Sequence, residues 1–117
     1  MLALARVSGR DAAPEVHFRE GYRLALRGLP LLDINSAERL RALMKQMFDA
    51  IPRARIDAFG RYVERVRAGA ATTPAEDREM AELTRTAVAA MPPGAQEDLR
   101  SIFGMALDLG RFDASRR

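Results

Sequence analysis

Cysteine is absent from the 117 residues of this chain, and histidine occurs once. Without cysteine the chain has no disulfide bond, no thiolate nucleophile and no sulfur-ligated metal site. His17 is the single imidazole that could act as a general base, and no sequence pattern pairs it with a serine in a hydrolase triad. We therefore expect no enzymatic activity and no cofactor.

Long hydrophobic runs are also missing. Apolar runs in the body of the chain, such as Leu29–Leu32, are far below the ~20 residues that a transmembrane helix requires. The first residues contain an apolar run too short for a secretory leader, with no basic stretch before it. These features predict a cytoplasmic protein that does not interact with a membrane.

Glycine-rich loops are a third absence. Gly60, Gly104 and Gly110 stand alone in the sequence, so no loop for cradling phosphate is indicated. Gly60 and Gly104 fall inside predicted helices, where we expect them to permit a close approach between helices. Gly110 is expected to end the last helix.

Apolar residues make up 48% of the chain and charged residues 30%, which is typical of a soluble globular protein. At this length we expect one helical domain over residues 1–117, with flexible ends at 1–13 and 111–117. The net charge is +3, and Lys45 is the only lysine among 19 basic residues. Such a skew toward arginine is typical of GC-rich genomes and is weak support for a selected binding surface.

Residues that mark the starts and ends of helices are clear from residue 35 onward. Asn35 and Glu38 can form one capping box, and Thr73 and Glu76 a second. Pro52 and Pro92, forty residues apart, each interrupt a helical pattern and suit the start of the next helix.

Between these signals, apolar residues recur at spacings of three and four, as on the buried face of a helix. The predicted core stripes are Leu40, Leu43, Met44, Met47, Phe48 and Ile51; Ile56, Phe59, Val63 and Val66; Met80, Leu83, Ala87, Val88 and Met91; and Leu99, Ile102, Phe103, Ala106 and Leu107.

The pattern predicts an all-α fold: a compact bundle of four or five helices built from two helical hairpins, about 36–69 and 74–110, plus an N-terminal helix or hairpin. The forty-residue period also fits a two-helix solenoid, although two copies are fewer than such arrays need. Residues 14–28 fit a helix with proline at its start and glycine at its end. They also fit a β-hairpin that turns at Glu20-Gly21, and Gly21 disfavours the helix.

A binding surface is predicted in the last helix, which is apolar nearly all round. Met105, Leu109 and Phe112 form a second stripe beside the core stripe, and one packing partner is not expected to bury both. This stripe favours a protein–protein interaction or self-assembly module whose partner is a second copy of the chain, as a homodimer. The N-terminal Leu2, Leu4 and Val7 are the alternative cover.

Nucleic-acid binding by a small regulator is the main alternative. Two sets of arginines would form ridges on the first and third helices, where they could hold phosphates: Arg19, Arg23 and Arg27, and Arg53, Arg61 and Arg65. Pairing of Asp57 with Arg61 would weaken this interpretation. A ligand carrier that uses the bundle core is a third hypothesis.

Overall fold

The computed structural model describes residues 14–116, and the prediction of an all-α bundle is confirmed there. Five α-helices and one short 3-10 helix follow one another: α1 (Pro14–Gly28), η1 (Leu29–Leu31), α2 (Ile34–Asp49), α3 (Arg53–Ala68), α4 (Pro74–Ala89) and α5 (Pro93–Ser115). Of the two alternatives for residues 14–28, a helix and a β-hairpin, the helix is therefore the one that forms. The expected flexible end at 1–13 lies outside the described residues.

The helices begin and end at the predicted capping and stop residues, with two exceptions. The capping box of Thr73 and Glu76 is present, and Gly69 ends α3 in the left-handed conformation with φ 75°. The box predicted at Asn35 is wrong, because Asp33 caps α2 instead and its Oδ1 accepts from the Ser36 N–H at 2.9 Å. The stop predicted at Gly110 is also wrong: α5 continues to Ser115, so most of the end expected to be flexible is helical.

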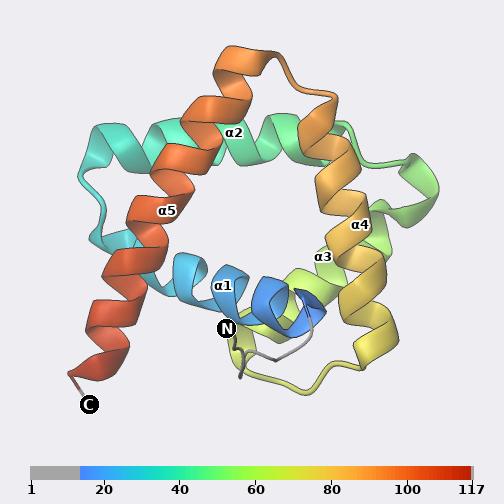
Figure 1. Ribbon diagram of the computed structural model, residues 1–117, viewed down its shortest axis with the longest axis horizontal. Helices are drawn as coiled ribbons and strands as arrows, with labels where there is room; N and C mark the ends of the chain where they lie inside the picture. The colour runs from blue at the N-terminus through green and yellow to red at the C-terminus, as the bar shows by residue number, and fades with distance from the viewer. Residues whose placement is uncertain (1–13, 117) are drawn as a thin grey trace, which may run out of the picture.

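Helix α1 packs against three of the other α-helices. It runs along α5 and also contacts α3 and α4, whereas α2 packs on α5 and α4 (Figure 1). The two predicted hairpins keep their order and their proline turns, but their members diverge from Pro52 and from Pro92 and are not closely packed pairs. An apolar stripe shows that one face of a helix is buried, but it does not show which helix packs against that face. Here α1 packs against α3, α4 and α5.

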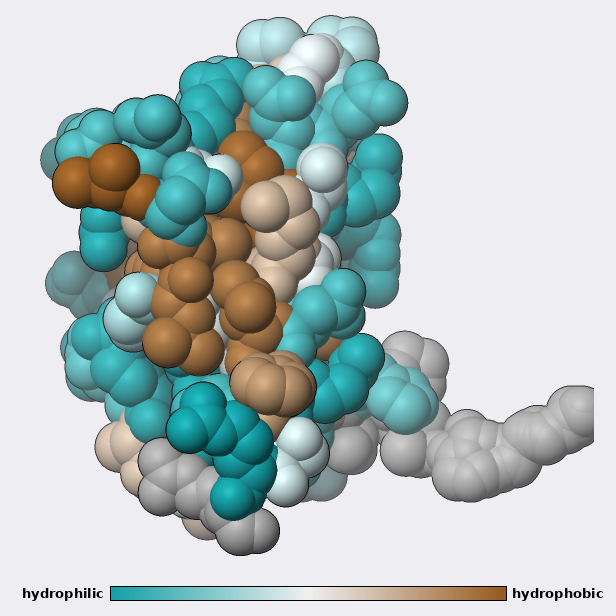
Figure 2. All heavy atoms as spheres, turned by 90° about the vertical axis from the view of Figure 1, so that its left-hand side faces the viewer, coloured by the Kyte–Doolittle hydropathy of each residue, from teal (hydrophilic) through white to brown (hydrophobic). Residues whose placement is uncertain are grey.

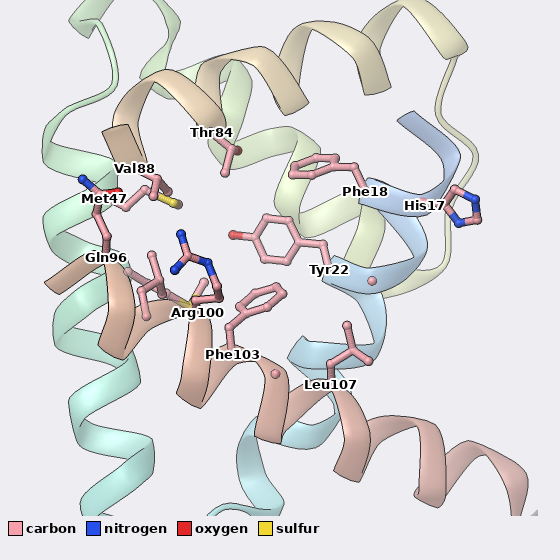
Figure 3. A pocket seen from close by; sticks show the side chains of 14 residues that line it. His17, Phe18, Tyr22, Met47, Thr84, Val88, Gln96, Arg100, Phe103 and Leu107 are labelled. Atoms are coloured by element: carbon pink, nitrogen blue, oxygen red, sulfur yellow. The ribbon is translucent and has the colours of Figure 1, made fainter. Parts of the chain in front are cut away.

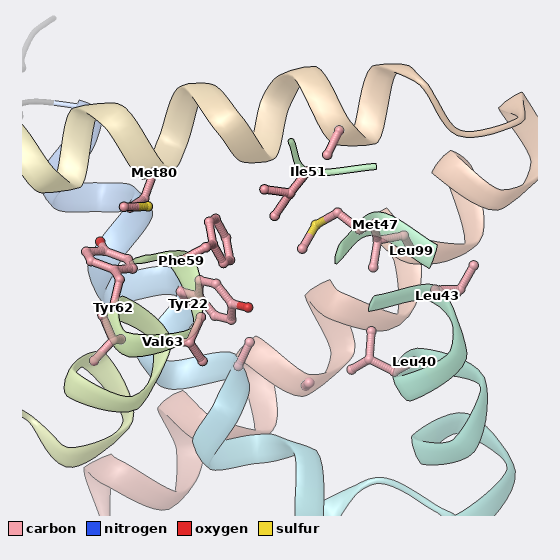
Figure 4. Close-up of a cluster of buried hydrophobic side chains, with 14 of the residues drawn as sticks. Tyr22, Leu40, Leu43, Met47, Ile51, Phe59, Tyr62, Val63, Met80 and Leu99 are labelled. Atoms are coloured by element: carbon pink, nitrogen blue, oxygen red, sulfur yellow. The ribbon is translucent and has the colours of Figure 1, made fainter. Parts of the chain in front are cut away.

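The buried side chains form one cluster at the meeting point of these helices (Figure 4). Phe59 and Tyr62 of α3 are fully buried, and Phe18 of α1 stacks on Tyr62 with ring centroids 6.3 Å apart. Most predicted core positions are buried or partly buried here, but Tyr62 was not among them. None of the helices within residues 14–116 combines the length and the apolar character needed to cross a membrane.

The crossing of α1 and α5 depends on glycine. A Cβ added to Gly110 would lie 1.8 Å from the Leu24 carbonyl oxygen, and one added to Gly28 would lie 1.8 Å from the Ala106 oxygen. Backbone therefore packs directly on backbone at this crossing. The same role predicted for Gly60 and Gly104 is wrong, because a Cβ at either position would meet nothing within 4 Å.

Candidate functional site

The predicted stripe on α5 is only partly exposed. Met105 is 43% and Phe112 60% exposed, whereas Leu109 is half-buried and packs against the core. The guanidinium of Arg116 lies 5.8 Å from the centre of the Phe112 ring. Two of the three predicted interface residues thus remain accessible to a partner.

Two further residues extend this surface. Four large hydrophobic side chains are exposed among the described residues: Leu31, Ile34, Met105 and Phe112. Leu31 lies in η1, which packs on α5, and Ile34 begins α2, which also packs on α5. Figure 2 views the side of the molecule where η1, the start of α2 and the second half of α5 lie, and it shows hydrophobic side chains gathered in the middle with hydrophilic ones around them. We call these four residues the apolar face.

The arginine ridge predicted on α1 exists, but its members are paired. Arg19 reaches Asp77 of α4 at 3.6 Å, Arg23 bonds Glu20 at 2.8 Å, and Arg27 bonds Asp113 of α5 at 2.7 Å. The pairs of Arg19 and Arg27 tie α1 to α4 and α5, whereas the Arg23–Glu20 pair lies within α1. All three pairs neutralise much of the ridge.

The arginines predicted on α3 differ from one another. Arg65 forms an ion pair with Glu76 at the start of α4. Arg53 and Arg61 form no ion pair within residues 14–116, so the predicted pairing of Asp57 with Arg61 is absent. The six arginines therefore do not form one free cationic surface.

The carboxylates at the start of α4 are engaged by other helices and by the helix's own first turn. Hydrogen bonds from Arg65, and then from the Thr73 backbone, lower the pKa of Glu76 to about 2. Asp77 is 1% exposed, and its Oδ1 accepts from the hydroxyls of Tyr62 at 2.8 Å and Thr72 at 2.7 Å. No group of three or more metal-ligating side chains occurs in the part of the chain that the structure describes.

A pocket opens between α1, α2, α4 and α5 (Figure 3). Its volume is about 380 Å³, and most of its wall is apolar. The apolar lining comes from Phe18, Met44, Met47, Val88, Leu99, Phe103 and Leu107, together with the ring of Tyr22. We call it the central pocket.

Three polar groups of the central pocket have no partner in the described chain. The Tyr22 hydroxyl and the Thr84 Oγ1 are both buried without a hydrogen bond, which for a buried hydroxyl costs about 1–3 kcal/mol. The third is Arg100, which forms no ion pair among residues 14–116. In Figure 3 its guanidinium and the Tyr22 hydroxyl point toward one another across the pocket.

The other two polar residues that line the central pocket either have a partner elsewhere or lie at the surface. The Gln96 Nε2 donates to the Met91 carbonyl oxygen at 2.8 Å and so stays at the turn between α4 and α5. His17 is exposed. Burial raises the pKa of Tyr22 above its ordinary value, and the nearby charge of Arg67 only partly opposes this. The Tyr22 hydroxyl is therefore a hydrogen-bond donor at neutral pH.

Sequence spacing could not have found the central pocket, because its polar groups come from three different helices. Part of the apolar face could be found from the sequence, since Met105 and Phe112 recur at helical spacing in the last helix. No protein-family model matches the chain, and neither the curated proteins nor the solved structures compared with it include a match.

Proposed function

We propose that this chain is a non-enzymatic protein–protein interaction module that associates with a second copy of itself through the apolar face. The observation that supports the proposal is that η1 and α2 both pack on α5, and that these three elements carry the exposed large hydrophobic side chains of the described residues: Leu31, Ile34, Met105 and Phe112. Apolar side chains inside a polar rim are the usual anatomy of an interface core. The cytoplasmic location stays a prediction.

The length and position of α5 favour a second copy as the occupant. This helix has 23 residues, whereas the other α-helices have 15 or 16. Its C-terminal end runs past α1 at the edge of the bundle (Figure 1). Met105 and Phe112 lie two helical turns apart on it, so two copies can lay these turns against each other around a twofold axis.

The expected dimer is weak. Four exposed anchors are few beside the ~20–30 residues that each partner contributes to a stable interface of ordinary size. We therefore expect dissociation in the micromolar range and a rapid exchange of subunits.

Sedimentation equilibrium over a concentration series tests the proposal. Phe112→Glu and Ile34→Glu place a charge in the contact without disturbing the core, and we expect folded monomers where the parent dimerises. Leu109→Glu is a poorer choice because Leu109 packs against the core. Gln46→Glu, at an exposed position on α2, is the control and should dimerise like the parent. A parent that is monomeric at high micromolar concentration would overturn the proposal.

The nucleic-acid alternative has less support. Four of its six arginines already pair with carboxylates, and their engagement by phosphate would require these ion pairs to break. Arg53 and Arg61 alone are a small footprint for a phosphate backbone.

A further inference from the structure

The central pocket has the size of a small-molecule site. At about 380 Å³ it lies within the range of ligand pockets, and it is more than twice the ~150 Å³ of a cavity that holds benzene. An apolar body of roughly two benzene volumes would fill it. The apolar wall supplies no hydrogen bond to such a body and would hold it by burial alone.

Two hydroxyls without partners belong to the lining of this pocket. Tyr22 is 3% exposed, and its hydroxyl has no partner among the described residues. The Thr84 Oγ1, from α4, is buried and unpartnered too. Both hydroxyls belong to residues that line the pocket, and a bound acceptor would satisfy them.

The charge of the lining specifies the kind of acceptor. None of the lining residues is acidic, and Arg100 is an exposed, unpaired cation whose guanidinium faces the Tyr22 hydroxyl (Figure 3). A guanidinium and two hydroxyl donors together suit an oxygen pair that carries negative charge. A carboxylate provides such a pair, with acceptor sites for all three donors.

We propose that the central pocket binds a small carboxylic acid with an apolar body, whose carboxylate accepts from Tyr22, Thr84 and Arg100. The apolar body lies against Phe103, Leu107 and Met47. This site is separate from the apolar face and does not rest on dimerisation.

Titration calorimetry with decanoate at neutral pH tests this site, with decanol and decylamine as matched probes. We expect decanoate to bind and both probes to bind at least about tenfold more weakly, because they lack the charged acceptor. Tyr22→Phe and Thr84→Val keep the packing and remove one donor each, and Arg100→Gln removes the charge. Each change should weaken decanoate binding by about tenfold or more.

Two controls locate the binding. Arg61→Gln removes an exposed, unpaired charge outside the pocket, and its affinity for decanoate should stay within about twofold of the parent. Phe112→Glu alters the apolar face and should also bind normally. Without ligand, Tyr22→Phe should unfold at the same temperature as the parent or higher, because its hydroxyl has no partner to lose.

Three results would overturn the proposal. The first is no decanoate binding at millimolar concentration, and the second is equal binding of decanoate and decanol. The third is binding that Phe112→Glu abolishes and Tyr22→Phe leaves intact, which would place the probe on the apolar face.

Discussion

At the start of α4, the carboxylate of Asp77 is held in the interior by donors from three directions. Tyr62 belongs to α3, Thr72 to the loop before α4, and Arg19 to α1. A buried carboxylate is tolerated only when its oxygens are hydrogen-bonded and its charge is balanced. Asp77 therefore fixes how α1, α3 and α4 meet.

Replacing this carboxylate should destabilise the fold. Asp77→Ala leaves the buried Tyr62 hydroxyl without its acceptor and Arg19 without its counter-charge. We expect the free energy of unfolding to fall by about 3 kcal/mol, at the low end for breaking a buried pair because Arg19 is partly exposed. Urea unfolding followed by circular dichroism measures this loss.

The matched control is Asp98→Ala, which removes an exposed ion pair with Arg39 on α2 and should cost less than about 1 kcal/mol. A double-mutant cycle of Asp77→Ala with Tyr62→Phe should show a coupling well above ~0.5 kcal/mol. Additive effects of the two changes would argue against the network.

At the scale of the helices, the crossing of α1 and α5 carries the tightest constraint. Gly28 and Gly110 let the two backbones touch, and Arg27 and Asp113 close the same end with an ion pair. The contact positions α5 against α1, and with it both the apolar face and one wall of the central pocket. A change at this crossing should therefore affect stability and both proposed surfaces together.

Gly110→Ala tests this constraint. The new Cβ would meet the Leu24 carbonyl group, and backbone atoms cannot swing aside as a side chain can. We expect a loss of about 1–3 kcal/mol in the free energy of unfolding from overpacking. Gly60→Ala on α3, where the Cβ meets nothing, should instead gain about 0.5–1 kcal/mol from helix propensity. Equal effects of the two changes on the urea midpoint would contradict the close crossing.

At the scale of the whole molecule, the net charge of +3 favours weak attraction to any polyanion. Because most arginines of the predicted ridges are paired, we expect duplex DNA to bind weakly, without sequence preference, and to be released by moderate salt. Fluorescence anisotropy at two salt concentrations measures this. A tight, sequence-selective complex that is lost in the Arg53→Gln, Arg61→Gln double variant would restore the nucleic-acid alternative.

The sequence by itself determined α2 to α5 and most of the buried positions, but it left residues 14–28 open between a helix and a β-hairpin. Local signals were sufficient for this: capping residues, prolines at helix starts and the 3.6-residue spacing of apolar side chains all act within one or two turns. The same spacing predicted a second stripe of Met105, Leu109 and Phe112, of which Met105 and Phe112 are exposed and Leu109 is half-buried against the core. The two errors at helix ends displaced the predicted end by only a few residues: Asp33 caps α2 in place of Asn35, and α5 ends at Ser115 rather than at Gly110.

Only the tertiary structure decided which helices meet. It packed α1 against α3, α4 and α5 and separated the predicted hairpins. It also used Gly28 and Gly110, both predicted as helix ends, as the contact between α1 and α5. It also brought Tyr22, Thr84 and Arg100 from three helices to one pocket. The physical reason is that apolar burial is non-directional: a stripe specifies that a face leaves water, and only close packing among all the helices selects its partner.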